Sequence, residues 1–151
     1  MQTTNSVTPE RAIPDGFEKP LYTAKTVTTG GREGASQSSD GRLDVKLSTP
    51  GGPGAGTNPE QLLAAGWSAC FIGALGKAAG QHKMRLSPET SINTEIDLCS
   101  GEDGYFLQAR LYISLPEIDA RIAQSLIEAA KATCPYSKAT QGNIKTAYFL
   151  V

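Results

Sequence analysis

Residues 58–82 read NPEQLLAAGWSACFIGALGKAAGQH, and this stretch decides the fold. Asn58 is a residue type that caps helices, Pro59 suits the first helical position, and Glu60 suits the positive end of the helix dipole. No charged side chain occurs in residues 61–76. A helix that is apolar all round is buried on every side. We therefore predict a long buried central helix around which the other elements pack.

Small residues form a stripe along this predicted helix. They recur at spacings of three and four, so they share one side of the helix, where another backbone could approach closely. The stripe consists of Gly66, Ala69, Gly73, Gly76 and Gly80. Cys70 lies beside it, in the middle of the helix. A helix with no polar face needs more cover than one small sheet supplies, so we expect a dimer.

Strands are predicted before and after this helix. Residues 21–28 are rich in β-forming residue types. In residues 42–48, apolar and polar residues alternate, which is typical of a strand with one buried face. Residues 91–99 and 105–115 alternate in the same way, and the five-residue glycine-containing loop between them favours an antiparallel hairpin. A last strand is predicted over residues 143–151.

A second helix is predicted over residues 119–134, between Pro116 and Pro135, because prolines commonly flank helices. Apolar residues recur at every fourth position along it, so Cys134 falls on its apolar face. The order along the chain is strands, helix, strands, helix, strand. Runs of strands rather than strict alternation favour an α+β fold over a parallel doubly wound sheet. We expect antiparallel sheets packed around the central helix.

Length and composition indicate one domain without a strongly basic surface. The chain has 151 residues and a formal net charge of −1, which argues against nucleic acid as a partner. No run reaches the about 18 uninterrupted apolar residues of a membrane span, and residues 1–20 lack the apolar core of a secretory signal. These features predict a cytoplasmic protein whose three cysteines are thiols. The one histidine, His82, is expected to cap a helix or to have no role, so neither a Cys/His metal site nor a histidine-based triad is favoured.

Three segments are expected to lie outside regular structure. Residues 1–20 are polar and are predicted to form a flexible leader before a single domain over residues 21–151; the alternative is an arm that wraps a partner chain. Residues 32–41 are expected to form a polar connection. Residues 49–57 contain four glycines and two prolines and are expected to form a surface loop. That loop lacks the Gly-Lys-Ser/Thr ending of a phosphate-binding loop, so nucleotide binding is not predicted.

The cysteines carry the candidate chemistry. Cys70, in the middle of the predicted central helix, is either a small core residue or a nucleophile. Cys134 ends the second helix, where the dipole does not favour a thiolate, so it suits a resolving role better than an attacking one. Cys99 shares the polar face of its strand with Glu95 and Asp97. Because neighbouring carboxylates disfavour a thiolate, we interpret Cys99 as a bystander.

Arg32 and Glu60 each have two interpretations. Arg32 follows two glycines outside any periodic segment, so it is either a solvated turn residue or a guanidinium that lowers the pKa of a buried thiol. Glu60 either interacts only with the helix dipole or also holds Arg32 in a bidentate pair.

Two longer segments resemble the signature segments of the organic hydroperoxide resistance proteins, within the osmotically inducible protein superfamily. They are TNPEQLLAAGWSACF at residues 57–71 and CPYSKATQGN at residues 134–143. Three shorter segments resemble the same family: LYTAK at 21–25, GGR at 30–32 and LDVKLSTP at 43–50. Two features depart from the family pattern, namely the additional Cys99 and a shorter loop at residues 51–56.

The resemblance implies a thiol-dependent peroxidase that reduces alkyl and fatty-acid hydroperoxides and folds as an intertwined α+β homodimer. It implies the peroxidatic role for Cys70 and the resolving role for Cys134, with Arg32 as the activating arginine and Glu60 as its carboxylate partner. The implied reductant is a dithiol such as a lipoyl group on a protein, and no metal or other cofactor is required. A Cys70–Cys134 bridge needs Cα atoms within about 7 Å, so the 119–134 helix should end against the middle of the central helix.

Helix geometry places the implied residues on two chains. Glu60 and Cys70 are separated by about 15 Å along one helix axis, which is too far for an arginine held at Glu60 to act on Cys70 of the same chain. Two central helices packed antiparallel across a twofold axis would bring the start of one helix toward the middle of the other. We therefore expect Arg32 and Glu60 to serve Cys70 of the partner subunit.

Sulfur chemistry defines the steps of the implied reaction. The Cys70 thiolate attacks a hydroperoxide oxygen and releases an alcohol, the sulfenic acid condenses with Cys134, and an external dithiol reduces the disulfide. A pocket with apolar walls favours alkyl hydroperoxides over hydrogen peroxide, since burial of alkyl surface contributes about 25 cal/mol per Å². Two alternatives remain. One is a dithiol–disulfide oxidoreductase acting on proteins, which the uncharged helix around Cys70 and the lack of a Cys-X-X-Cys motif disfavour. The other is a non-catalytic carrier of fatty acids.

Overall fold

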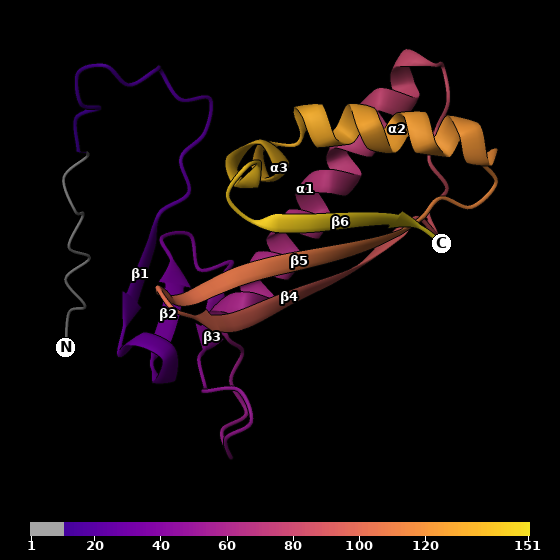
Figure 1. The fold of residues 1–151 in the computed structure, drawn as a ribbon. Helices are drawn as coiled ribbons and strands as arrows, with labels where there is room; N and C mark the ends of the chain where they lie inside the picture. The colour runs from indigo at the N-terminus through magenta and orange to yellow at the C-terminus, as the bar shows by residue number, and fades with distance from the viewer. Residues whose placement is uncertain (1–10) are drawn as a thin grey trace.

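The computed structural model describes residues 11–151, which form two three-stranded sheets and three α-helices (Figure 1). The first sheet, in the order β1-β2-β3, consists of β1 (Thr26–Thr29), β2 (Ala35–Ser38) and β3 (Asp44–Lys46). A short 3-10 turn, η1 (Gly31–Glu33), connects β1 to β2. The second sheet, in the order β4-β5-β6, consists of β4 (Ser91–Gly101), β5 (Gly104–Ser114) and β6 (Lys145–Leu150). The helices are α1 (Pro59–Gln81), α2 (Ala120–Thr133) and α3 (Pro135–Thr140). The predicted α+β class is confirmed.

Helix α1 begins as predicted and carries one side of the core. The Asn58 side chain accepts a hydrogen bond from the backbone N–H of Gln61, and Pro59 occupies the first helical position. Five side chains along one face are buried: Trp67, Phe71, Leu75, Ala78 and Ala79. They pack with apolar residues of β5 and α2, including Leu111, Ile113, Leu126 and Ile127. The core therefore lies between α1, the second sheet and α2.

The opposite side of α1 is open in the single chain. Ala69, Gly73, Gly76 and Gly80 are exposed, and a Cβ added at Gly73 would meet nothing within 4 Å. The prediction of a helix buried on every side is therefore not confirmed in the single chain, because these four positions face outward; a Cβ at Gly80 would also meet nothing within 4 Å, and one at Gly76 would meet only the end of the Leu86 side chain at 3.9 Å. Gly66 differs, since a Cβ there would stand 2.8 Å from the hydroxyl oxygen of Tyr136.

Helix α1 also meets the length and composition criteria of a membrane span. It has 23 residues, with a mean hydropathy of 1.4 over its most apolar window. Such a helix was not expected from the sequence, because polar residues such as Ser68 interrupt its apolar run. One face of α1 packs against β4 and α2, and 28% of that window is buried within the chain.

The second sheet is mixed rather than antiparallel. β4 and β5 form the predicted antiparallel hairpin, but Gly101 already pairs with Gly104, so the connection is a two-residue turn and not the five-residue loop expected from sequence. Gly104 has a φ of 102°, a conformation that favours glycine. β6 pairs with β5 in parallel. The prediction of antiparallel sheets is wrong here, because α2 and α3 carry the chain back over the sheet before β6 enters in the direction of β5.

Other differences from the sequence predictions are local. Residues 32–41, expected to be a polar connection, contain η1 and β2. The first strand begins at Thr26 rather than at residue 21. The strand predicted over residues 42–48 is confirmed at β3, with Leu43, Val45 and Leu47 turned inward.

The segment before β1 lies partly outside the described residues. The predicted leader covers residues 1–20, of which the first ten are not described. Residues 11–20 are exposed and form neither helix nor strand, apart from one turn. Their flexibility stays a prediction. The loop at residues 49–57 is confirmed as lacking helix and strand, and most of it is exposed.

Candidate active site

The structure brings Cys70 and Cys134 together. Both are free thiols, and the Cys134 Sγ donates to the Cys70 Sγ at 3.1 Å. Cys70 is half-buried in the middle of α1, whereas Cys134 is fully buried. The end of α2 therefore lies against the middle of α1, as the sequence predicted. Two thiols this close need only a small adjustment to form a disulfide.

Local sequence explains why Cys134 stands there. Asp119 caps α2 by accepting a hydrogen bond from the backbone N–H of Arg121. The buried face of the helix then continues to Cys134, which has left helical geometry with φ −63° and ψ 120°. Pro135 follows and begins α3, so the chain bends at Cys134 between two helices. This bend directs the thiol toward α1.

The single chain does not activate Cys70. Burial raises the pKa of the Cys70 thiol, the Cys134 sulfur raises it further, and a backbone hydrogen bond from Tyr136 opposes the shift. Among residues 11–151, no cation contributes to lowering this pKa. A thiolate at this position needs a positive charge from elsewhere.

Arg32 and Glu60 form the bidentate pair that was one of the two predicted arrangements. The Arg32 guanidinium donates from both terminal nitrogens to the Glu60 carboxylate, at 3.0 Å and 2.7 Å. Arg32 lies in η1, which follows Gly30 with φ 72°, and Glu60 lies in the first turn of α1. The hydrogen bond from Arg32 lowers the pKa of Glu60, which keeps the carboxylate charged. In return, the Glu60 carboxylate raises the pKa of Arg32.

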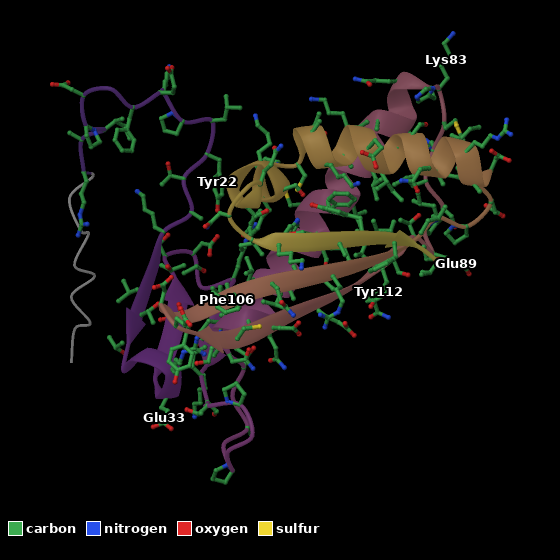
Figure 2. The ribbon with its side chains drawn as sticks, in the orientation of Figure 1. Tyr22, Glu33, Lys83, Glu89, Phe106 and Tyr112 are labelled. Atoms are coloured by element: carbon green, nitrogen blue, oxygen red, sulfur yellow. The ribbon has the colours of Figure 1, made fainter. Side chains whose placement is uncertain are left out.

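This pair lines an open cavity of about 310 Å³ at the junction of the first sheet, the start of α1 and the end of the β4–β5 hairpin. Its other lining residues are mostly apolar: Pro59, Leu63, Leu98, Tyr105, Phe106 and Leu107. Figure 2 shows Phe106 beside the first sheet, at the opposite end of the molecule from Lys83. The Leu98, Tyr105 and Phe106 side chains are exposed. The cavity therefore offers apolar surface next to a held guanidinium.

The four predicted site residues thus form two pairs. Cys70 and Cys134 meet where the junction of α2 and α3 reaches α1, and Arg32 and Glu60 lie in the cavity, whose lining does not include either thiol. Cys99 is half-buried on β4. His82 is the C-cap residue of α1. Helix capping was one of the two possibilities given for it from the sequence, the other being no role. Within residues 11–151, no group of three His, Cys, Asp or Glu side chains could hold a metal ion.

Sequence reasoning missed the residues that support the thiol pair. Ser137 and Trp67 are buried and hydrogen-bonded to each other at 3.0 Å. Both fall inside the two segments quoted from the sequence, but α3 is six residues long and has no apolar periodicity that would have predicted it. A buried serine carries no signal in a hydropathy pattern.

Comparison with known proteins places the chain in a family. The family model described as OsmC-like protein matches residues 51–148. The organic hydroperoxide resistance protein of Xanthomonas axonopodis pv. citri is 49% identical over 131 residues, which cover 84% of this chain and 92% of that protein. The organic hydroperoxide resistance protein OhrA of Bacillus subtilis is 39% identical and covers 85% of this chain and 94% of its own length.

A solved structure has the same fold. The crystal structure of the organic hydroperoxide resistance protein OhrB of Bacillus subtilis superimposes with a TM-score of 0.83 at 38% identity, covering 87% of this chain and all of that one. The chain belongs to the OsmC-like family, and it is similar to the members of that family named for organic hydroperoxide resistance.

Proposed function

We propose that this protein is a thiol-dependent peroxidase that reduces organic hydroperoxides, with Cys70 as the attacking and Cys134 as the resolving cysteine. The observation that carries the proposal is the pair of free sulfurs 3.1 Å apart. Relatives at 49% and 39% identity that are named for organic hydroperoxide resistance support the substrate class.

The proposed reaction needs only the two cysteines, the hydroperoxide and an external dithiol. The Cys70 thiolate attacks one oxygen of the hydroperoxide, the O–O bond breaks, and the leaving alkoxide takes a proton to become an alcohol. The resulting sulfenic acid condenses with the Cys134 thiol, which forms the disulfide and releases water. A dithiol then reduces the disulfide by exchange and is itself oxidised. No metal or organic cofactor takes part.

Activation of Cys70 is assigned to Arg32 of the partner subunit. The Arg32 side chain is 45% exposed although it is bound to Glu60, so part of the guanidinium remains free for another anion. The exposed small-residue stripe of α1 offers a surface on which a second α1 can pack closely. An antiparallel pair of α1 helices brings this guanidinium toward the partner's Cys70, and a nearby guanidinium stabilises a thiolate. The dimer is then required for activity.

The cavity beside Arg32 fits the alkyl part of the substrate. Leu63, Leu98 and Phe106 give it apolar walls, and burial of alkyl surface favours an organic hydroperoxide over hydrogen peroxide. For the reductant we propose a dithiol such as a lipoyl group on a protein. For the location we propose the cytoplasm, where the thiols stay reduced between turnovers.

A coupled assay tests this function. Purified protein is given cumene hydroperoxide and dihydrolipoamide, and alcohol formation is measured. The proposal requires turnover that Cys70→Ser abolishes, that Cys134→Ser reduces to one oxidation followed by over-oxidation, and that Cys99→Ser leaves nearly unchanged. Near-normal turnover by Cys70→Ser would contradict the mechanism. Tight binding of fatty acids without turnover would support a carrier instead, and reduction of protein disulfides without peroxidase activity would support an oxidoreductase.

A further inference from the structure

A buried polar cluster is formed by residues from the same two helices, α1 and α3, that flank the thiol pair, together with one residue of β6. The Ser137 hydroxyl, only 3% exposed, accepts a hydrogen bond from the Trp67 Nε1–H at 3.0 Å and another from the Tyr148 hydroxyl at 3.2 Å. Ser137 belongs to α3, Trp67 to α1 and Tyr148 to β6. One hydroxyl oxygen therefore connects three separate elements of the fold.

Two residues of the cluster are close to a thiol in the chain, and the third contacts the residue that follows Cys70. Trp67 precedes Cys70 by one helical turn, and Ser137 follows Cys134 by one turn. The Tyr148 ring stacks on Phe71, the residue after Cys70, with ring centroids 5.4 Å apart. The Lys131 ammonium lies 4.7 Å from the centroid of the same tyrosine ring. The cluster thus contacts the chain one turn before Cys70 and one turn after Cys134.

Helix α3 needs such an anchor. It has six residues, too few for a helix to be stable by its own hydrogen bonds. It is joined to α2 through Cys134, whose backbone is extended and breaks the helix. The Cys134 N–H stays bonded to the Ala130 carbonyl, so a loosened α3 would change the backbone rotation on the Pro135 side of Cys134 and with it the alignment of the Cys134 thiol on Cys70. The Trp67–Ser137 bond connects α3 to the helix that carries Cys70.

We propose that Ser137 is a positioning residue for the resolving step: its hydroxyl holds α3 against α1 and β6 so that Cys134 Sγ stays within bonding reach of Cys70 Sγ. This rests on the proposed function. Ser137 does not touch the hydroperoxide, because its hydroxyl is buried and bonded to Trp67 and Tyr148, so the first oxidation of Cys70 does not depend on it.

The condensation step is the one that depends on alignment. The Cys70 sulfenic acid has two fates, in which either the Cys134 thiol displaces water to form the disulfide, or a second hydroperoxide oxidises the sulfenic acid to sulfinic acid and leaves as alcohol. The two fates compete, and misplacement of Cys134 by about 1 Å slows condensation by up to about 100-fold. A loosened α3 therefore favours over-oxidation at lower hydroperoxide concentration.

The test uses Ser137→Ala, with Ser125→Ala as the matched control. Ser125 is exposed on α2 and its hydroxyl bonds only to the Ile122 carbonyl of its own helix among the described contacts. Reduced proteins receive increasing cumene hydroperoxide without reductant, and mass spectrometry of intact protein gives the ratio of disulfide to sulfinic acid. For Ser137→Ala we expect half over-oxidation at a concentration about tenfold lower than for wild type. The rate of the first Cys70 oxidation should change less than about threefold, and Ser125→Ala should match wild type.

A second variant separates positioning from folding. Tyr148→Phe keeps the ring on Phe71 but removes one of the two bonds to Ser137, so it should shift the same ratio in the same direction by less. If both act through α3, the double variant should be no worse than Ser137→Ala alone.

The outcomes are distinct. An unchanged ratio in both variants would overturn the role of Ser137, and so would a lower melting temperature with an unchanged ratio, which would make the residue purely structural. Should Ser137→Ala fail to fold, the ratio measured on Tyr148→Phe decides alone. A wild-type protein that forms no disulfide would contradict the proposed function itself.

Discussion

Two of the arginine–carboxylate clusters in the described part of the chain, those of Arg110 and Arg32, differ in how many hydrogen bonds the guanidinium already makes. Arg110 on β5 donates to Glu95 at 2.7 Å and to Asp97 at 2.6 Å and 2.9 Å, using all three of its nitrogens. Glu95 lies directly opposite it on β4. Among residues 11–151, Arg32 donates only to Glu60, from its two terminal nitrogens, and joins segments 28 residues apart in the chain.

The surroundings differ as well. The Arg110 cluster lies on the polar face of a two-strand hairpin, where cross-strand ion pairs support register and contribute little to stability. The Arg32 pair lines a cavity with apolar walls. One carboxylate balances the charge of a guanidinium, so the Arg110 cluster carries a net negative charge and repels a further anion. The Arg32–Glu60 pair is neutral, and its exposed guanidinium can still donate to a thiolate. The comparison indicates that Arg110, which binds two carboxylates, has a structural role, whereas Arg32, which binds one, is a candidate functional residue.

The largest expected difference between the two arginines is in catalysis. Arg32→Ala should lower kcat/KM for cumene hydroperoxide by about 100-fold or more, because the Cys70 thiolate loses the cation that stabilises it. Arg110→Ala should stay within about twofold of wild type. Equal losses in the two variants, measured at saturating dihydrolipoamide, would remove the distinction.

A mixture of two inactive variants shows whether Arg32 acts on Cys70 of its own chain or of the partner subunit. Arg32→Ala and Cys70→Ser proteins are combined, allowed to exchange subunits, and assayed. A mixed dimer has one intact site if Arg32 serves the partner's Cys70, so a statistical mixture should regain about a quarter of wild-type activity. If the mixture remains inactive although mass spectrometry shows mixed dimers, the guanidinium acts within its own chain.

Glu60→Gln tests the carboxylate that holds Arg32. The amide can still accept a hydrogen bond but has no charge, so the guanidinium is held less firmly. We expect a roughly tenfold loss of kcat/KM, smaller than that of Arg32→Ala, with a higher pH needed for half-maximal Cys70 alkylation. If Glu60→Gln retains full activity while Arg32→Ala loses it, the carboxylate has no part in positioning.

The smallest effect concerns acid stability at the structural cluster. Hydrogen bonds from Arg110, and then from Gln108, lower the pKa of Asp97 to about 2. Because the folded pKa lies below the unfolded value of about 3.9, the contribution of Asp97 is fully present above that value and is lost as pH falls through about 2. Urea unfolding of wild type and Asp97→Asn should therefore differ by a constant amount above about pH 5 and converge toward pH 2. A difference that does not change with pH would contradict the charge-based account.

The sequence predicted what strong local signals encode. The Asn58-Pro59 start of α1, the alternation of the β4–β5 strands and the apolar face of α2 ending at Cys134 all matched the structure. These features depend on neighbouring residues, so a window of sequence contains them. The meeting of Cys70 with Cys134 followed from the resemblance together with the position of each cysteine on its helix.

What the sequence did not predict depends on distant or weak signals. β2 reads Ala-Ser-Gln-Ser and has no apolar alternation, so only its pairing with β1 and β3 makes it a strand. The parallel entry of β6 is set by α2 and α3 rather than by its own residues. The outward stripe of α1 was expected to be covered, because hydropathy reports that a face is apolar and not which chain covers it. Ser137 could be recognised only after its two bonds were seen.

One measurement tests the central claim most directly. Fully reduced protein is treated with one equivalent of cumene hydroperoxide per chain, without reductant, and its cysteines are mapped by peptide mass spectrometry while the alcohol is quantified. The account predicts one alcohol per chain, a disulfide between Cys70 and Cys134, and Cys99 still a free thiol. Unconsumed hydroperoxide, or a disulfide that includes Cys99 in place of Cys134, would contradict it.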